Sequence, residues 1–304
     1  MSLTPELLGG GIWRIPLPLP FGPPYINVYL LPCPGGWMLI DTGPDTRESA
    51  DALAAAMAGF GVEPPQLRHI VLTHLHPDHS ARASQLRDLS GATVWMHSAD
   101  ADFLLKLKST TGPYDVLDEA MREAGTPEAT RIQVRASYDK LAQLFPMLSP
   151  DALLEDGQVL ESSIGPLKVL WTPGHSPGHC CFYAPERKLL FAGDHIIDHI
   201  MPHIGWLPGE DTLGQYFGTL DRLDQLDVDT ILSSHGLPFG GLQEWTKRVR
   251  EHHASRTAEI RQHQQDGVTM TDDLVRRLWP RELRPLDYQL ALTEVLAHLE
   301  HARR

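Results

Sequence analysis

The chain has 304 residues, of which 42% are hydrophobic and 21% are charged, and its formal net charge at pH 7 is −13. This length and composition fit a globular protein with one large domain and a smaller appended one, and they exclude collagen-like, coiled-coil and wholly disordered chains. Because no apolar run approaches the roughly 20 residues of a membrane-spanning helix, we expect no membrane partner.

The negative charge is concentrated in the first four fifths of the chain. Residues 1–243 carry 15 basic and 29 acidic side chains, whereas residues 244–304 carry 11 and 10. Such an acidic body repels a phosphate backbone, which disfavours nucleic acid as a partner. The first residues lack the basic start and apolar core of a signal peptide, and Cys33, Cys180 and Cys181 cannot form a disulfide framework. We therefore expect a cytoplasmic location.

Strand and helix patterns alternate along the first third of the chain. Alternating apolar residues predict strands over residues 25–31, 37–41, 70–72 and 93–97. Asp45 is expected to cap a helix that ends before Gly61, and a second helix is expected around Leu86 and Leu89, before Gly91. The compositionally biased segment in this part is the proline-rich stretch 16–24.

Helical periodicity then extends from about residue 101 to 150. Strands are predicted over residues 167–171, 180–183, 189–192 and 230–232, with a helix over 216–226. After Gly241 the pattern predicts helix almost to the end of the chain. The order of these elements predicts an α+β protein in which two packed sheets are flanked by helices.

A dense group of ionisable residues follows the predicted strand 70–72. The segment Thr73–His79 (THLHPDH) places three histidines and one aspartate within six positions. Neutral imidazoles and carboxylates are the ligand types that suit zinc, and also iron or manganese. A solvated polar turn is the alternative interpretation, and the density of ligands argues against it.

Three more groups of the same kind occur where other predicted strands end. They are His175 and His179 in TPGHSPGH, Asp194 in FAGD, and His235 in SSHG. Rigid strand ends can bring ligands from distant segments together. The combined set is large enough for two metal ions that share a bridging carboxylate.

The order HxHxDH, TPGHSPGH, GD and SHG, preceded by Asp41-Thr42-Gly43, resembles the metallo-β-lactamase superfamily over roughly residues 10–240. The resemblance implies an αββα sandwich with hydrolase activity. It implies that His74, His76 and His175 hold a first divalent ion. A second would be held by Asp78, His79 and His235. Asp194 would bridge the two ions.

The resemblance also implies roles beyond the ligands themselves. Asp78 and Asp194 would take part in catalysis, and Asp41 would orient a ligand histidine from outside the coordination sphere. From its position beyond His175, we expect His179 to be a structural or orienting residue and not a ligand. Two ions, zinc ahead of iron or manganese, would lower the pKa of a shared water. Thiols leave readily, so a thioester suits such a site.

Two branches of this superfamily share further features with the chain. The phrase TPGHSPGHCCFY is similar to the glyoxalase II-like branch, although Leu75 stands where that branch often has a further histidine. The helical segment from Glu251 to Ile260 is similar to the β-lactamase-like protein 2 branch, which has a winged-helix-like tail. We accordingly divide the chain into a catalytic domain, residues 1–243, and a helical, truncated winged-helix-like domain, residues 244–304.

The helical insertion 101–150 is predicted to cover the metal site and to line a substrate pocket. The residues expected at this pocket are Tyr25, Tyr114, Tyr138 and His199. An equally open alternative is that the aromatic residues pack the core of the insertion itself.

Two hypotheses of function follow. The first is a dinuclear metallohydrolase acting on a small acyl compound, with a glutathione or coenzyme A thioester ahead of a lactone or other ester, and β-lactam hydrolysis at most a weak side activity. The second is a metal-dependent ribonuclease or phosphodiesterase, which would need a basic strip formed by Lys247, Arg248, Arg250, Arg256 and Arg261. The apolar face of the last helices suggests a homodimer.

Overall fold

The computed structural model describes residues 3–20, 22–107 and 113–304. Within them the strands form two sheets. The first contains, in spatial order, β1 (Glu6–Leu7), β2 (Trp13–Pro18), β3 (Tyr25–Cys33), β4 (Gly36–Ile40), β5 (Leu67–Val71), β6 (Thr93–His97) and β7 (Ala152–Leu154). The second contains β12 (Thr230–Ser233), β11 (Leu189–Gly193), β10 (Cys180–Ala184), β9 (Leu167–Trp171) and β8 (Val159–Leu160).

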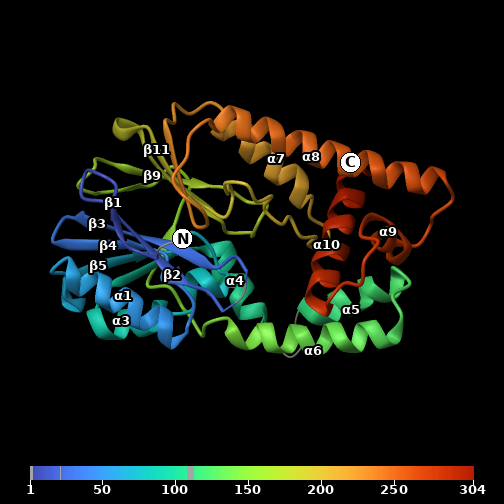
Figure 1. Cartoon of the computed structure of the whole chain (residues 1–304), viewed down its shortest axis with the longest axis horizontal. Helices are drawn as coiled ribbons and strands as arrows, with labels where there is room; N and C mark the ends of the chain where they lie inside the picture. The colour runs from blue at the N-terminus through green and yellow to red at the C-terminus, as the bar shows by residue number, and fades with distance from the viewer. Residues whose placement is uncertain (1–2, 21, 108–112) are drawn as a thin grey trace.

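Helices cover both outer faces of this pair of sheets and continue beyond it (Figure 1). Those next to the first sheet are α1 (Arg47–Gly59), α2 (Pro77–Ser80), α3 (Ala83–Ser90) and α4 (Ser98–Leu107). Those next to the second sheet are α7 (Thr212–Leu223) and the first part of α8 (Leu242–Gln265). The remaining helices are α5 (Pro113–Glu123), α6 (Glu128–Leu144), α9 (Thr271–Leu278) and α10 (Pro285–His301). The predicted αββα sandwich is confirmed.

The core between the two sheets is built from alternate residues of the facing strands. Phe182 and Phe191 of the second sheet and Leu31 of the first are almost fully buried there. The ring of Tyr29 meets Phe191 edge to face, with centroids 5.3 Å apart. Burial of such large apolar side chains is the main stabilising contribution to the sandwich.

The parallel strands place their carboxyl ends at one edge of the sandwich. Strands β4, β5, β6 and β7 run parallel to one another in the first sheet, and β11 and β12 run parallel to each other in the second. The sheets are tied together at this edge by the backbone bond from Cys180 N–H to the carbonyl of Thr73 and by the Tyr29 hydroxyl, which donates to the carbonyl of Ser233. Every segment that carries a predicted metal ligand therefore starts from this edge.

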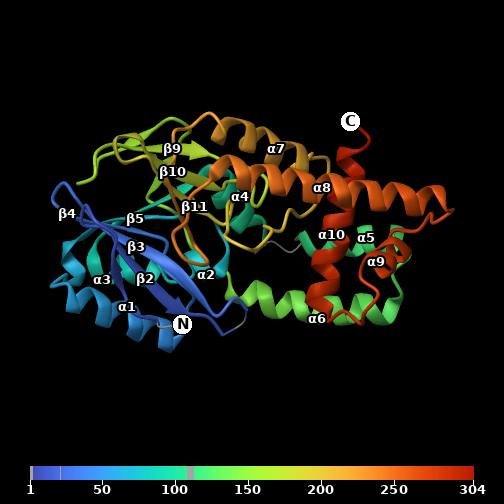
Figure 2. The ribbon, with the colours of Figure 1, turned by 45° about the horizontal axis from the view of Figure 1, so that its top comes forward.

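The helical insertion and the C-terminal helices share one hydrophobic core. Met121 of α5, Val134 of α6, Leu274 of α9 and Leu292 of α10 are all buried in it. These helices gather at the end of the molecule opposite to the sheets, as both views show (Figures 1 and 2). Helices α5 and α6 thus pack on the tail, and the cover over the metal site stays a prediction.

Two details of the fold were not predicted from the sequence, and a third agrees with it. Strand β2 forms in the proline-rich stretch because Pro16 and Pro18 lie beyond the short β1, where no ladder partner needs an N–H on that side. Cys180 and Cys181 are both buried, since Cys180 faces the core between the sheets and Cys181 faces α7 and α8. Among the described residues, each helix is too short or too polar to cross a bilayer.

Candidate metal centre

Three imidazoles converge at the edge where the parallel strands end. His74 and His76 lie on the loop between β5 and α2, and His175 lies on the loop after β9. Nδ1 of His76 is 2.8 Å from Nε2 of His74 and 3.0 Å from Nε2 of His175. These three nitrogens form the first ligand group.

In His74 and His175, the ring nitrogen that faces away from the group contacts another polar atom of the protein. Nδ1 of His175 donates to the carbonyl of His203 over 2.9 Å, which leaves Nε2 as the nitrogen with the free lone pair. Nδ1 of His74 lies 3.0 Å from the hydroxyl of Thr73. Burial, with the charges of neighbouring imidazoles, lowers the pKa of His74, His76 and His175, so their neutral, ligating form is favoured.

A second group lies next to the first. It contains Asp78 and His79 from α2, Asp194 from the end of β11 and His235 from the end of β12. Nε2 of His79 is 3.6 Å from Asp78 and 3.5 Å from Asp194, and Nε2 of His235 lies at the same two distances from these carboxylates. Ligands bound tetrahedrally at about 2.1 Å are separated by about 3.4 Å, so the spacing fits a metal ion.

Hydrogen bonds fix the histidines of the second group as well. Nδ1 of His79 donates to the carboxylate of Asp41 over 2.8 Å, and Nδ1 of His235 donates to the carbonyl of Tyr25 over 2.9 Å. In both rings Nε2 therefore points at the centre of the group. Such outer hydrogen bonds hold the ring orientation and raise the basicity of the ligating nitrogen.

The carboxylates of the second group favour a positive charge at its centre. Burial would lower the pKa of His79, yet the carboxylates of Asp194, Asp78 and Asp41 raise it well above its ordinary value. Burial likewise works against the charged form of Asp194, but His235 and His79 hold the pKa of this carboxyl well below its usual range. Two buried atoms, Nε2 of His79 and Oδ1 of Asp194, have no hydrogen-bond partner. A divalent cation would satisfy all of these groups, so the donor set fits a metal.

Asp194 lies between the two groups. Its Oδ2 is 3.5 Å from Nε2 of His79 in the second group and 3.8 Å from Nε2 of His175 in the first. Its backbone N–H donates to Nε2 of His179 over 3.2 Å. The carboxylate is therefore placed to contact ions in both groups, and the fully buried His179 holds the backbone that carries it.

The four predicted pocket residues lie in different places. Tyr25 is buried and meets the site through its carbonyl group. The rings of Tyr114 and Tyr138 pack 5.2 Å apart in the helical core, as the alternative interpretation expected. His199 has an 82% exposed side chain that lies 3.0 Å from Asp198. The structure brings none of these four side chains into the two described ligand groups.

Two other residues lie closer to the ligands. The ring of Phe145, just after α6, is 6.3 Å from that of His76. His203, whose carbonyl holds His175, also lines a cavity of about 230 Å³. Further residues of its lining are Met201, His253, Trp279, Leu290 and Glu294. The ring of His253 in α8 is buried because Phe217 and His298 pack against it.

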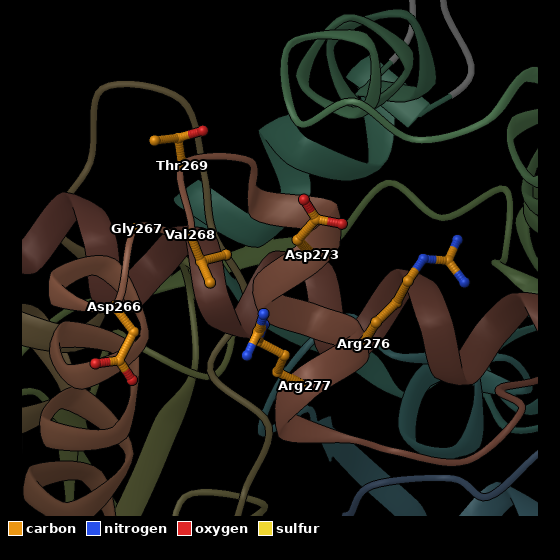
Figure 3. Close-up of a pocket in the computed structure, with 7 residues that line it drawn as sticks. All are labelled: Asp266, Gly267, Val268, Thr269, Asp273, Arg276 and Arg277. Carbon is orange, nitrogen blue, oxygen red and sulfur yellow. The ribbon is translucent and has the colours of Figure 1, made fainter.

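A larger cavity of about 490 Å³ lies at the turn between α8 and α9 (Figure 3). Its charged lining includes Asp266, Asp273, Arg276 and Arg277, and Arg276 is already bonded to Asp272. No metal ligand is among its described lining residues. It is therefore separate from the chemistry of the two ligand groups.

Comparisons with known proteins agree with this geometry. Residues 21–235 match the sequence profile of the Metallo-beta-lactamase superfamily. The chain is 30% identical over 222 residues to acyl-coenzyme A thioesterase MBLAC2 of Gallus gallus, covering 70% of this chain and 73% of that protein. Against the bovine and human proteins of the same name it spans 56% of their length.

Solved structures show the same architecture. The metallo-beta-lactamase family protein TTHA1429 from Thermus thermophilus superposes with a TM-score of 0.84 at 29% identity, covering 98% of this chain and 94% of the other. The structure of TTHA1623 in a di-iron-bound form gives a TM-score of 0.52 at 28% identity, covering 75% of this chain and 97% of the other. The matches extend over both the sandwich and, for the first protein, the helical end.

Proposed function

The chain belongs to the metallo-beta-lactamase superfamily of hydrolases, and we propose that it hydrolyses a small acyl thioester, of the coenzyme A type ahead of the glutathione type. The observation that carries the proposal is the pair of converging ligand groups with Asp194 between them. The thioester assignment is supported by the relatives whose name is acyl-coenzyme A thioesterase.

His74, His76 and His175 would hold one divalent ion, Asp78, His79 and His235 the other, and Asp194 would contact both. When bound, such a pair of ions lowers the pKa of water toward neutrality and polarises a carbonyl group. Asp78 is the more exposed of the two carboxylates, with 15% of its side chain accessible against 10% for Asp194. Its free oxygen can accept a hydrogen bond from the attacking water and orient it toward the substrate.

The net reaction needs no further reactant. Water forms a new C–O bond at the acyl carbon, the C–S bond breaks, and the released thiolate takes up a proton. The thiolate of a free thiol has a conjugate-acid pKa of about 8.5, so this leaving group departs with little assistance. An amine leaving group would need a strong general acid at the same position.

We place the acyl group in the cavity beside His203. Met201, Trp279 and Leu290 give this cavity an apolar surface, and the His203 carbonyl connects its wall to the metal ligand His175. Phe145, next to His76, gives a second apolar contact near the reacting atoms. An acyl thioester can bury its chain on these surfaces while its carbonyl lies at the ligand groups.

Ion pairs within the predicted basic strip argue against the ribonuclease alternative. Arg250 is paired with Asp221 and Asp224, and Lys247 lies near Glu251. Arg256 contacts Glu259 and Glu294 and stacks on Trp279. Cations that are already neutralised by neighbouring carboxylates release few counterions on binding a phosphate backbone.

The identity of the metal follows less directly from the ligands. Histidine and carboxylate donors suit zinc, iron and manganese alike. We propose zinc, with iron as the alternative favoured by the likeness to the protein described in a di-iron-bound form. Metal analysis of the purified protein distinguishes these two.

The function is tested by thiol release from a panel of coenzyme A and glutathione thioesters, with a lactone and a short RNA as competing substrates. We expect release by the metal-replete protein, and its loss after chelation and in Asp194→Ala. Recovery on adding metal back to the chelated wild type, but not to Asp194→Ala, would show that the ions act through this site. Hydrolysis of the lactone or RNA with no thiol release would overturn the thioester proposal.

A further inference from the structure

A buried carboxylate lies just outside the first ligand group. Asp100 is in the first turn of α4, which follows β6 at the carboxyl edge of the first sheet. Its side chain is fully buried. Asp100 is not predicted from the sequence, because no ligand motif surrounds it; its position after a parallel strand is the available signal.

The carboxylate of Asp100 joins the two loops that carry the first group. Its Oδ2 accepts the backbone N–H of Leu75 over 2.8 Å and the hydroxyl of Ser176 over 2.9 Å. Its Oδ1 accepts the backbone N–H of Gly178 over 2.6 Å. Leu75 lies between the ligands His74 and His76, and Ser176 directly follows the ligand His175.

The backbone of Gly178 packs directly against Asp100. A Cβ atom on Gly178 would lie 2.5 Å from the backbone nitrogen of Asp100 and 2.8 Å from its own Cβ, so only glycine allows so close an approach. Burial raises the pKa of Asp100 to about 7, whereas its three hydrogen bonds favour the ionised form, in which such bonds are about twice as strong as neutral ones. The two loops are therefore held at one fixed separation.

The second group has a different support. Asp41 accepts hydrogen bonds from His79 and from the backbone N–H of Thr73, while Tyr25 accepts the one from His235. The described contacts of Asp100 reach residues beside His74, His76 and His175 and none beside His235 or Asp194. Asp41 thus supports His79 directly and reaches His74 through the Thr73 hydroxyl, whereas Asp100 joins only the loops of the first group.

We propose that Asp100 is a positioning residue for the first metal ion: by joining the loops at Leu75, Ser176 and Gly178, it holds His74, His76 and His175 convergent before an ion binds. This inference rests on the metal centre of the proposed function. An ion that binds a preformed group does not have to order the loops, so removal of the support weakens binding, typically by 10- to 100-fold.

The test measures metal affinity and does not depend on catalysis. In a His235→Ala background, which weakens the second group, the metal-free protein is titrated with Co²⁺ in competition with a chromogenic chelator. Asp100→Asn should weaken the tightest remaining site about 10- to 100-fold. In a His175→Ala background, which weakens the first group, Asp100→Asn should leave the remaining site unchanged.

Two further variants separate positioning from general damage to the fold. Asp272→Asn removes another buried carboxylate, which binds Tyr288 and Arg276 in the helical end, and should leave both sites unchanged. Ser176→Ala deletes one of the three hydrogen bonds to Asp100, so it should weaken Co²⁺ binding at the first site by a smaller factor than Asp100→Asn does. This variant tests the inference even if Asp100→Asn folds poorly.

The possible results test the role of Asp100, the metal centre and the proposed substrate separately. Equal Co²⁺ affinity with and without Asp100→Asn in the His235→Ala background overturns the inference, as does equal weakening in both backgrounds. If the wild-type protein takes up no Co²⁺ at all, the metal centre itself is overturned and the inference with it. Two-site binding by wild type together with failed thioester hydrolysis affects only the proposed substrate.

Discussion

Nδ1 of His79 donates a 2.8 Å hydrogen bond to Oδ2 of Asp41, and Oδ1 of the same carboxylate accepts the backbone N–H of Thr73. Asp41 has a φ of 59°, an uncommon value that aspartate and asparagine tolerate better than other residues. This contact connects the end of β4 to the candidate ligand His79 on α2 and fixes which ring nitrogen faces the second group.

Asp41→Asn keeps the backbone conformation and the shape of the side chain but removes its charge. We expect metal affinity of the second group, and thiol release with it, to fall by about 10- to 100-fold, because His79 loses the partner that raises its basicity. Metal content after dialysis and the rate of thiol release check this. Asp45→Asn, at an exposed position nearby, is the matched control and should behave as wild type. Equal metal retention in both variants would contradict the role of the contact.

If the acyl group lies in the cavity beside His203, a change at Leu290 should affect long acyl thioesters and not short ones. Leu290 lines this cavity and is 37% exposed. Leu290→Trp narrows the cavity, so KM for a decanoyl thioester should rise about tenfold, equivalent to about 1.4 kcal/mol. KM for an acetyl thioester should stay unchanged, since a two-carbon group does not reach the cavity. Leu105→Trp, on an exposed part of α4, serves as the control. Parallel changes for both substrates would place the acyl chain elsewhere.

One side chain joins the insertion to the tail by hydrogen bonds. The hydroxyl of Tyr288 in α10 lies 2.7 Å from the hydroxyl of Thr126, before α6, and 2.6 Å from Oδ1 of Asp272. Tyr288→Phe leaves these two buried groups without that partner, which should lower the free energy of unfolding by about 1–3 kcal/mol. Chemical denaturation measures the change. Tyr183→Phe, whose hydroxyl donates to the carbonyl of Asp227 at a partly buried place, should lower it less. A larger loss in Tyr183→Phe would contradict this ordering.

A buried histidine pair makes stability depend on pH. Burial lowers the pKa of His298 to about 4 and that of His253 to about 3, and the rings meet with Nδ1 of His253 3.3 Å from Nε2 of His298. Arg256, His252 and His301 add positive charge near His298. The unfolded chain binds protons at these histidines near pH 6.5, whereas the folded chain does not until a much lower pH. The two buried neutral histidines therefore do not lower the free energy of unfolding above pH 6.5. As the pH falls toward 4, proton uptake by the unfolded chain lowers this free energy.

The measurement is the free energy of unfolding of the metal-free protein between pH 7 and pH 4. His298→Gln should flatten this pH dependence, because the variant has one fewer group that protonates only on unfolding. His199→Gln should not, because this side chain is 82% exposed in the folded protein. An unchanged slope in His298→Gln would show that other groups control the acid sensitivity.

The metal ligands could be found in the sequence because each follows a recognisable strand. His74 to His79 come after β5, Asp194 after β11 and His235 after β12, and parallel strands in packed sheets must end at a common edge. Strand boundaries at residues 93–97 and 167–171 also agree with the structure. Side-chain alternation and the polar residue after a strand are both short-range signals. A strand found from the sequence therefore also locates the candidate ligand that follows it.

The residues that surround the site were decided by contacts that no local pattern reports. Asp100 reaches Ser176 across 76 positions, and Tyr25 reaches His235 across 210. Tyr114 is buried because α5, α6 and the last three helices assemble one core, whereas His253 is buried because Phe217 of α7 and His298 of α10 pack against it. Periodicity shows that a helix has an apolar face but not what that face will meet, because the partner is set by packing between distant segments. The sequence by itself therefore determined the sandwich, the candidate ligands and the support from Asp41, because these follow short local patterns. Only the tertiary structure decided that Asp100 joins two of the ligand loops and which side chains surround the site, because these contacts join distant segments.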